Sequence, residues 1–325
     1  MTKKKKRLVV VLGMHRSGTS VVTRGLKVLN VQLGKGLLPP VKGVNEKGYW
    51  EDKEIYLFNT EMLAQFGRDW SNLAEISPIE VKILHQQGFF LRAVELLRKK
   101  TNDTPIFGFK DPRTTKLLPF WKDVFDHLKF DVSYVMVIRH PLSVVKSLAK
   151  RDDFPEEQSY LLWLGHVIPS LIGSNGSKRV LVDFDTLMNS PEHEITRIAE
   201  FLDLKVKPDA LRIYTNKFIS ENLRHTIYYP NDLLIADSAP PIVQEIYTAL
   251  LDVATDKLKL DDIELQNKLT LWSDEFDRLK SPLALLDKLF CQKKELREME
   301  RNNHPEQPGE MVKNHFSNDG IRSTN

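Results

Sequence analysis

The stretch Arg7–Asn30 reads RLVVVLGMHRSGTSVVTRGLKVLN. Its apolar, β-branched beginning at Leu8–Leu12 favours a short buried strand over a helix. A polar turn bounded by Gly13 and Gly18 follows, and the apolar residues beyond it recur at helical spacing. A strand, a glycine-bounded turn and a helix in this order predict a phosphate-binding loop.

The turn contains the residue types that an anion-binding loop requires. Glycines let backbone N–H groups face inward, and the N-terminus of the following helix adds its positive dipole end. In Gly13-x-x-x-x-Gly18-Thr19-Ser20, a threonine stands where nucleoside triphosphatases have the lysine that reaches the β- and γ-phosphates. The sequence therefore predicts an anion cradle without that lysine. The candidate anion-binding residues of this loop are Gly13, His15, Arg16, Ser17, Gly18, Thr19 and Ser20.

Composition restricts the class of protein. The chain has 325 residues, of which 41% are hydrophobic, enough to bury one large core or two modest ones. The net charge of +3 is small and basic residues do not alternate with aromatic ones, so we expect no nucleic-acid partner. The single cysteine, Cys291, excludes an intramolecular disulfide and fits a reducing compartment. No apolar run is long enough to span a membrane, and we find no secretory signal and no Cys/His spacing typical of a metal site. We expect a soluble, cytoplasmic protein without a metal.

Predicted strands and helices alternate along most of the chain. This alternation predicts a three-layer α/β fold, in which a mostly parallel sheet is covered on both faces by helices. Glycine and proline are too frequent in Val31–Tyr49 for regular structure. The further predicted strands are 105–109, 132–138 and 179–184, and the clearest predicted helices are 54–66, 78–100, 158–171, 191–202 and 241–258.

The C-terminal region has a different character. Apolar residues at Leu283, Leu286 and Leu289 predict one short amphipathic helix, whereas the last residues are polar and rich in Asn, Pro, Gly and Ser. We therefore expect a core domain over 1–270, a helical extension over 271–300 and a disordered tail over 301–325.

Charged residues follow the second and third predicted strands, at the edge where open α/β sheets bind ligands. Lys110-Asp111-Pro112-Arg113 follows the second strand, and it forms either part of a ligand site or a salt-bridged turn fixed by its proline. Arg139 ends the third strand, and Ser147 and Arg151 lie on one side of the next predicted helix. An arginine and a hydroxyl that converge there predict a second phosphate site.

The segment Asn45–Asp52 places carboxylates on either side of an aromatic pair. Glu46 and Glu51 are candidates for a general base beside a bound substrate. An ordinary polar surface loop is the other reading of this segment.

Four of these segments resemble the sulfotransferase family, in its bacterial branch. They occur in the order found in that family and extend roughly from Leu8 to Asp185. Gly13–Ser20 resembles its 5′-phosphosulfate loop, and Arg139 with Ser147 resembles its 3′-phosphate motif. The segments Asn45–Glu51 and Lys110–Arg113 resemble those that lie between the two.

The resemblance implies a phosphate-loop fold and transfer of a sulfuryl group from 3′-phosphoadenosine 5′-phosphosulfate (PAPS) to a hydroxyl or amine of a small-molecule or carbohydrate acceptor. This donor has no γ-phosphate, which explains the missing lysine. The loop amides, Arg16 and Thr19 would hold the phosphosulfate, and Lys110 would stabilise charge at the leaving oxygen. The resemblance favours Glu51 as the base, because it follows the run Gly48-Tyr49-Trp50 as in the bacterial branch, with Glu46 and His15 as alternatives. The residues implied for the 3′-phosphate side are Arg139, Ser147 and Arg151.

Two other functions remain open at this stage. A nucleoside-triphosphate-dependent kinase or phosphotransferase would use Asp111 as a magnesium ligand, although the missing lysine argues against it. A nucleotide-binding protein of the same fold without turnover would bind the nucleotide and transfer nothing.

Overall fold

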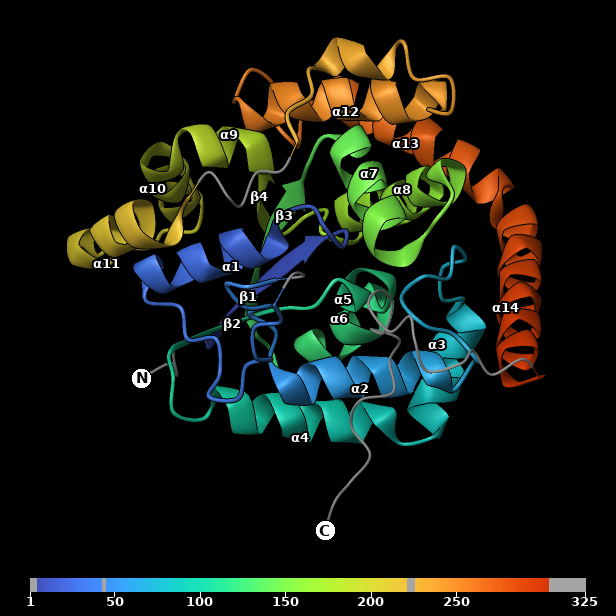
Figure 1. Ribbon diagram of the computed structural model, residues 1–325. Helices are drawn as coiled ribbons and strands as arrows, with labels where there is room; N and C mark the ends of the chain where they lie inside the picture. The colour runs from blue at the N-terminus through green and yellow to red at the C-terminus, as the bar shows by residue number, and fades with distance from the viewer. Residues whose placement is uncertain (1–4, 43–44, 221–225, 304–325) are drawn as a thin grey trace.

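The computed structural model describes residues 5–42, 45–220 and 226–303. Within these residues a parallel sheet has the strand order β2-β1-β3-β4. Val11 pairs with Lys110 on one side and with Val135 on the other, so the carboxyl ends of three strands meet at one edge (Figure 1). The strands are β1 (Arg7–Gly13), β2 (Ile106–Lys110), β3 (Asp131–Ile138) and β4 (Lys178–Asp183).

Helices cover both faces of this sheet (Figure 1). The α-helices are α1 (Thr19–Leu26), α2 (Lys53–Ala64), α3 (Pro78–Gln86), α4 (Phe89–Thr101), α5 (Arg113–Lys116), α6 (Leu118–His127), α7 (Pro141–Asp152), α8 (Glu156–Gly173), α9 (Phe184–Asn189), α10 (Pro191–Phe201), α11 (Pro208–Ile213), α12 (Pro241–Ala254), α13 (Ile263–Arg278) and α14 (Lys280–Asn303). Shorter helical turns are η1 (Lys27–Leu29), η2 (Tyr214–Phe218) and η4 (Pro230–Leu233).

The apolar run of β1 separates two hydrophobic cores. Leu8, Val10 and Leu12 pack into the larger core, whereas Val9 and Val11 pack into the smaller one on the other face. A strand buried on both faces needs apolar residues at every position, which is why this run does not alternate. The predicted three-layer α/β fold is confirmed.

The predicted helix over 78–100 is wrong in one respect, because the chain forms two helices there. Ser77 and Glu80 make the capping box that begins α3. Gly88 then adopts a left-handed conformation with φ 83°, which ends α3 and allows α4 to begin in a new direction. The sequence Ser190-Pro191 also predicts a side-chain cap for α10, but Ser190 makes no side-chain capping bond.

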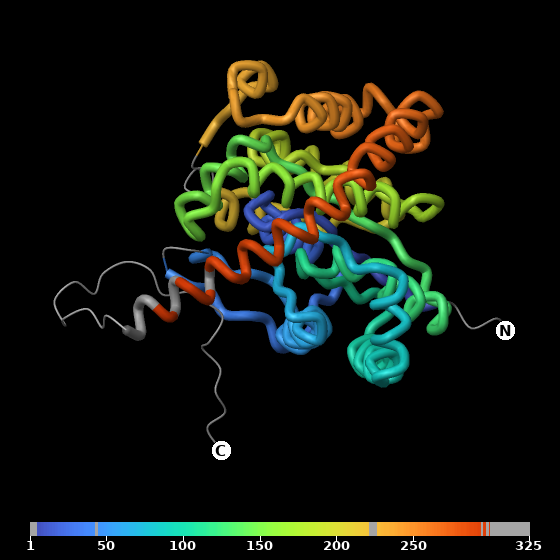
Figure 2. The backbone as a smooth tube through the Cα atoms, turned by 90° about the vertical axis from the view of Figure 1, so that its right-hand side faces the viewer, coloured from blue at the N-terminus to red at the C-terminus, as the bar shows by residue number. Residues whose placement is uncertain are grey.

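The C-terminal part is more helical than the sequence suggested. The extension is not short, because α14 has 24 residues. The expected boundary after residue 270 falls inside α13, whose Trp272 and Phe276 are buried in the larger core. Cys291 lies exposed on α14. In Figure 2, α14 crosses the molecule diagonally beside the segment that joins α2 to α3. Residues 304–325, most of the expected tail, lie outside the described part of the chain.

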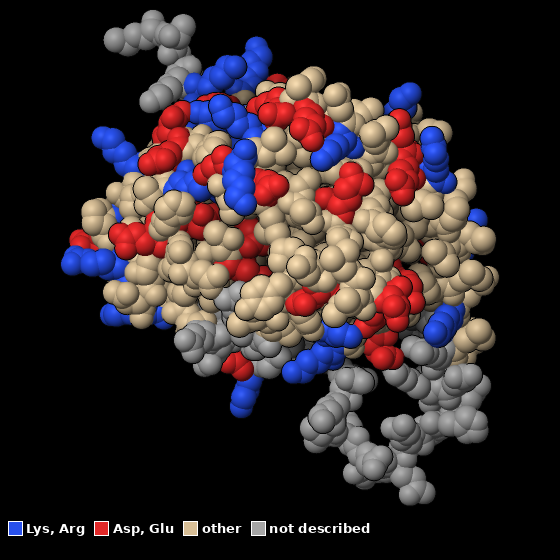
Figure 3. All heavy atoms as spheres, turned by 90° about the horizontal axis from the view of Figure 1, so that it is seen from above, with Lys and Arg blue, Asp and Glu red and all other residues tan. Residues whose placement is uncertain are grey.

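Acidic and basic side chains are interspersed over the face that carries α12 and α13 (Figure 3), in keeping with the small net charge. Among the described residues, no helix combines the length and apolar character that crossing a membrane requires.

Candidate active site

The loop between β1 and α1 depends on two glycines. Gly13 has φ 149° and Gly18 has φ 83°. A Cβ atom at Gly13 would lie 2.6 Å from the Val137 carbonyl oxygen, and one at Gly18 would lie 2.0 Å from the Phe184 ring. Only glycine fits such close approaches. The loop therefore lies directly against β3 and the start of α9.

The loop leads straight into α1, whose first N–H groups have no acceptors within the helix. Ser17 is buried, and its N–H donates to the Met14 carbonyl at 3.3 Å. The Ser17 hydroxyl has no hydrogen-bond partner among the residues that the structure describes. Thr19 is also buried at the first position of α1. Unmatched donors at a helix N-terminus fit an anion.

Arg16 joins the loop to the strand end of β3. Its Nε donates to Ser147 Oγ at 2.8 Å, and its carbonyl accepts from Arg139 at 3.1 Å. Burial lowers the pKa of Arg16 to about 10, and repulsion from Arg151 and Arg139 contributes. The two anion sites predicted from separate motifs therefore form one cationic cluster.

Arg139 is 6% exposed and lies over the Phe184 ring, 4.6 Å from its centroid. A second guanidinium nitrogen donates to Thr226 Oγ1 at 3.4 Å, and Thr226 in turn donates to Ser143 at 2.9 Å. His140 then caps α7 through its Nδ1, which accepts from the Leu142 N–H at 3.3 Å. Packing and capping together fix Arg139 at the tip of β3.

Arg151 lies one turn beyond Ser147 on α7, but its contacts are different. Its Nε donates to the Asp152 carboxylate at 2.7 Å, and its guanidinium lies over Trp70, 4.9 Å from the ring centroid. The structure thus places Arg151 at the border of the cluster, beside a tryptophan that the sequence did not single out.

A buried ion pair lies at the other side of the loop. Lys110 Nζ is 2.5 Å from Glu51 Oε1, and both side chains are less than a tenth exposed. Lys110 is also 3.4 Å from Ser20 Oγ, so the pair borders the N-terminus of α1. Burial raises the pKa of Glu51, while the charge of Lys110 opposes that rise. A carboxylate in this setting is a stronger base than one in water.

The segment Asn45–Asp52 closes over α1. The Ser20 hydroxyl donates to the Tyr49 carbonyl at 3.0 Å and accepts from Asn45 at 3.2 Å. Asp52 caps α2 through the N–H groups of Glu54 and Ile55, which fixes the backbone beside Glu51. The two candidate bases are separated, because Glu46 is exposed whereas Glu51 is buried.

Asp111 is a structural residue in this arrangement. It is fully buried, and one carboxylate oxygen accepts from Arg113 at 3.0 Å while the other accepts from Asn59 at 2.9 Å. Asn59 also accepts from Trp121 at 2.8 Å. These bonds engage both carboxylate oxygens, so the geometry favours the salt-bridged turn over a magnesium ligand.

His15 packs against Trp70, the ring that the Arg151 guanidinium also covers. Its ring centroid is 4.4 Å from that of Trp70 and 6.4 Å from that of His166. Burial lowers the pKa of His15 well below its ordinary value, and nearby cations such as Arg113 reinforce this, so the ring is neutral. Its Nε2 is buried without a hydrogen-bond partner among the described residues. No local sequence pattern marks Trp70 as its neighbour.

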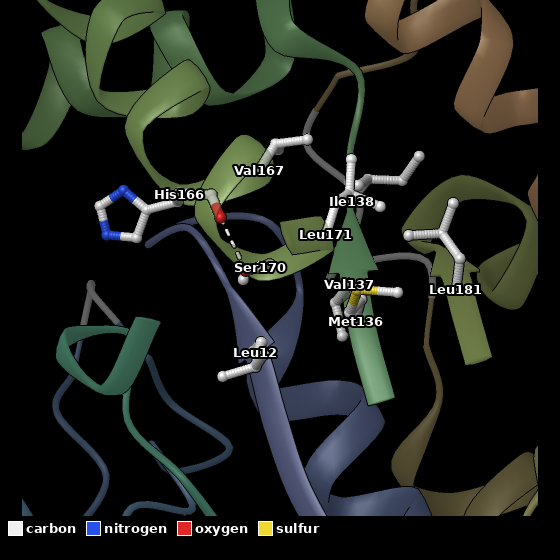
Figure 4. A pocket seen from close by; sticks show the side chains of 10 residues that line it. Leu12, Met136, Val137, Ile138, His166, Val167, Ser170, Leu171 and Leu181 are labelled. Atoms are coloured by element: carbon white, nitrogen blue, oxygen red, sulfur yellow. Dashed lines mark hydrogen bonds between the residues drawn. The ribbon is translucent and has the colours of Figure 1, made fainter. Parts of the chain in front are cut away.

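A small cavity lies behind the loop, between the sheet and α8 (Figure 4). Its volume of about 10 Å³ suits about one water molecule and no substrate. His166 lies at one end, and its carbonyl accepts from Ser170 at 2.6 Å. The apolar lining residues include Leu12, Met136, Val137, Ile138, Val167, Leu171 and Leu181. This cavity is therefore too small to serve as a substrate site.

A parallel sheet with a glycine-bounded loop after β1 and cations at the ends of β2 and β3 is typical of α/β proteins that bind anionic ligands. The sequence profile described as "Sulfotransferase family" matches residues 9–208. The chain belongs to the sulfotransferase family, and so to the transferases.

Similar solved structures include the sulfotransferase domain from the curacin biosynthetic pathway, with 16% identity, 77% of this chain and 98% of that chain covered, and a TM-score of 0.44. The sulfotransferase domain of the Synechococcus olefin synthase is 16% identical, and the match covers 85% of this chain and 97% of that chain with a TM-score of 0.42. Retinol dehydratase, in complex with androsterone and the inactive cofactor PAP, is 13% identical, and the match covers 84% of this chain and 80% of that chain with a TM-score of 0.35. No curated protein matches the chain.

Proposed function

We propose that this protein transfers a sulfuryl group from PAPS to a hydroxyl or amine acceptor. The observation that carries the proposal is the position of Arg16, which contacts Ser147 through its side chain and Arg139 through its carbonyl. One residue thereby connects the loop that suits a 5′-phosphosulfate with the cations that suit a 3′-phosphate. PAPS carries both anions on one nucleoside.

The chain offers suitable partners for both ends of this donor. The loop amides from Gly13 to Ser20, the buried Ser17 hydroxyl and Thr19 would hold the 5′-phosphosulfate. Arg139 and Ser147 would hold the 3′-phosphate, with Arg151 at the border of that site. No group of described residues suits a metal ion, and the proposal requires none.

Bound PAPS supplies the sulfuryl group and leaves as adenosine 3′,5′-bisphosphate (PAP). The protein contributes positioning and stabilisation of charge, as in phosphoryl transfer. Arg16 and Lys110 stabilise the negative charge that develops on the leaving phosphate oxygen as its bond to sulfur breaks. Glu51 accepts the proton of the acceptor hydroxyl while the new bond from oxygen to sulfur forms.

The acceptor is proposed to approach the Lys110–Glu51 pair across the segments 67–77 and 154–160. Trp70 and Phe154 belong to these segments, and their ring centroids are 5.5 Å apart. We propose a small-molecule or carbohydrate acceptor and no nucleic-acid partner. The exposed thiol of Cys291 suits a reducing compartment, so we propose the cytoplasm as the place of action.

The test is a thermal-shift titration with PAP, AMP, ADP and ATP, each with and without magnesium. A ligand at 100 times its Kd stabilises the folded state by about 2.7 kcal/mol, which is easily measured. We expect selective, magnesium-independent stabilisation by PAP, followed by release of PAP from PAPS when an acceptor is supplied. Preference for magnesium-ATP would instead assign a kinase. PAP binding without transfer to any member of a broad acceptor panel would assign a nucleotide-binding protein.

A further inference from the structure

Helix α14 reaches the active-site side of the molecule through one carboxylate. Asp287 is 8% exposed, and its two oxygens accept from the N–H groups of Leu73 at 2.6 Å and Ala74 at 2.9 Å. These residues belong to the segment between α2 and α3, which lies beside α14 in Figures 1 and 2. A buried carboxylate that accepts two consecutive backbone N–H groups makes strong, charge-assisted bonds.

The segment that Asp287 holds is tied together by its own polar groups. The Asp69 N–H donates to Asn72 Oδ1 at 2.7 Å, and the Ser71 N–H donates to Asp69 Oδ1 at 2.7 Å. Lys116, which is buried on α5, donates to the Asn72 carbonyl. The backbone around residue 70 is therefore fixed on both sides, and such local turns hold their central residue in place.

Trp70 is the central residue of this segment, and its ring contacts the candidate site. Its ring centroid lies 4.4 Å from the His15 ring centroid and 5.5 Å from that of Phe154. The Arg151 guanidinium lies over the Trp70 ring, 4.9 Å from its centroid. His15 belongs to the anion-binding loop, and Arg151 borders the cationic cluster. A continuous set of contacts thus runs from Asp287 through Trp70 to two residues of the site.

We propose that Asp287 is a positioning residue, through which helix α14 holds Trp70 against His15 and Arg151 and so sets the geometry of the anion site. The proposal rests on the proposed function only where PAP serves as the probe. Without Asp287, the buried Leu73 N–H and the half-buried Ala74 N–H lose their acceptor, and the segment around Trp70 loosens. Affinity for PAP then falls although Asp287 touches no part of the proposed donor site.

The experiment is a double-mutant cycle on the full-length chain, with the Kd for PAP measured by calorimetry. We expect Asp287→Ala to raise the Kd roughly fivefold, a typical effect for a residue that acts through a network. Trp70→Ala should raise it at least as much, and the double variant should be no worse than Trp70→Ala alone. Asp287→Asn keeps one acceptor oxygen and should lose less affinity than Asp287→Ala.

The matched control is Asp262→Ala, which removes the carboxylate that caps α13 through the Glu264 N–H at 2.9 Å. It should lower Tm and leave the Kd for PAP unchanged. If Asp287→Ala also lowers Tm without changing that Kd, Asp287 only stabilises the fold and the proposal is wrong. Additive effects of Asp287→Ala and Trp70→Ala would likewise overturn it.

Hydrogen exchange without any nucleotide separates this proposal from the proposed function. We expect Asp287→Ala to speed exchange of the amides in 69–74 and also in the loop 13–20, with no such change in Asp262→Ala. Faster exchange confined to 69–74 would overturn the coupling. If the wild-type protein fails to bind PAP, the proposed donor is wrong, and the exchange data still decide whether α14 controls the loop.

Discussion

The two sides of the loop between β1 and α1 differ in the arrangement of their charged side chains. On one side Arg16, Arg139 and Arg151 lie close together, and burial, reinforced by repulsion from Arg151 and Arg139, lowers the pKa of Arg16. On the other side Lys110 and Glu51 form a buried ion pair, with the buried pair of Asp111 and Arg113 nearby. The comparison teaches that the first side has the charge arrangement that suits the proposed anion site, whereas the second has the buried carboxylate that suits the proposed proton acceptor.

The largest expected effect comes from removing the proton acceptor. Glu51→Gln should lower kcat by about 10²–10⁴-fold, the usual contribution of a general base. Because burial raises the pKa of Glu51, wild-type kcat should rise with pH through that raised pKa and fall as the carboxylate is protonated. Stopped assays at saturating PAPS across pH 5–9 measure this rise of kcat with pH.

Glu46→Gln is the matched control, because Glu46 lies exposed in the same segment. Glu46→Gln should keep the wild-type kcat and its rise with pH. If Glu51→Gln keeps the wild-type kcat and its pH dependence while Glu46→Gln loses both, the base is Glu46. If both variants keep full activity, the carboxylate-base mechanism is wrong.

A somewhat smaller effect on the rate is expected for Lys110→Ala, about 10²–10³-fold in kcat, as for other groups that stabilise developing charge. Without Lys110, the charge that opposes the effect of burial is lost, and the pKa of Glu51 rises further. The rise of kcat with pH should therefore move to higher pH. An ionised Glu51 then lies buried without its partner, at a cost of about 3 kcal/mol to the free energy of unfolding.

The sign of this stability effect depends on pH. An acid whose folded-state pKa is raised loses stability as pH increases above its unfolded-state pKa. The deficit of Lys110→Ala in urea unfolding should therefore be larger at pH 8 than at pH 5. An equal deficit at both values would mean that Glu51 is not the partner whose charge matters.

On the anion-attracting side, Arg139→Ala should weaken PAP binding by about 10–100-fold, the range expected for charge-assisted hydrogen bonds to a phosphate. AMP lacks the 3′-phosphate, so its affinity should change little. Calorimetry with both nucleotides makes the comparison. Equal losses for PAP and AMP would place Arg139 at the 5′ end of the nucleotide and contradict the proposed assignment.

The residues that the sequence identified belong to patterns that are local in the chain. Gly13 and Gly18, the strand that precedes them and the charged residues after β2 and β3 are recognisable because short segments dictate strand, turn and strand end. The contact between Arg16 and Ser147 was not predicted as such, yet it follows once both segments lie at the same sheet edge.

The features that escaped prediction depend on distant partners. Asp287 binds Leu73 across more than half of the chain, and Trp70 acquires its role only from what packs around it. Asp111 has the composition of a ligand site, but its bonds to Asn59 and Arg113 make it structural. Sequence periodicity reports which face is buried and says nothing about which distant group lies opposite.

The smallest expected effect concerns a matched pair of glycines with the same backbone conformation. Gly18 and Gly88 both have φ 83°, but a Cβ at Gly18 would lie 2.0 Å from Phe184, whereas one at Gly88 meets nothing within 4 Å. Gly88→Ala should therefore cost only the strain of a left-handed alanine, about 1–2 kcal/mol in the free energy of unfolding.

The Kd of Gly88→Ala for PAP should equal that of the wild-type protein. Gly18→Ala should cost more stability and also weaken PAP binding, since Phe184 must shift and Arg139 lies over that ring. Urea unfolding and calorimetry on the two variants compare them directly. If Gly18→Ala loses stability without losing affinity, the loop tolerates movement of Phe184, and the packing of Arg139 on this ring does not organise the anion site.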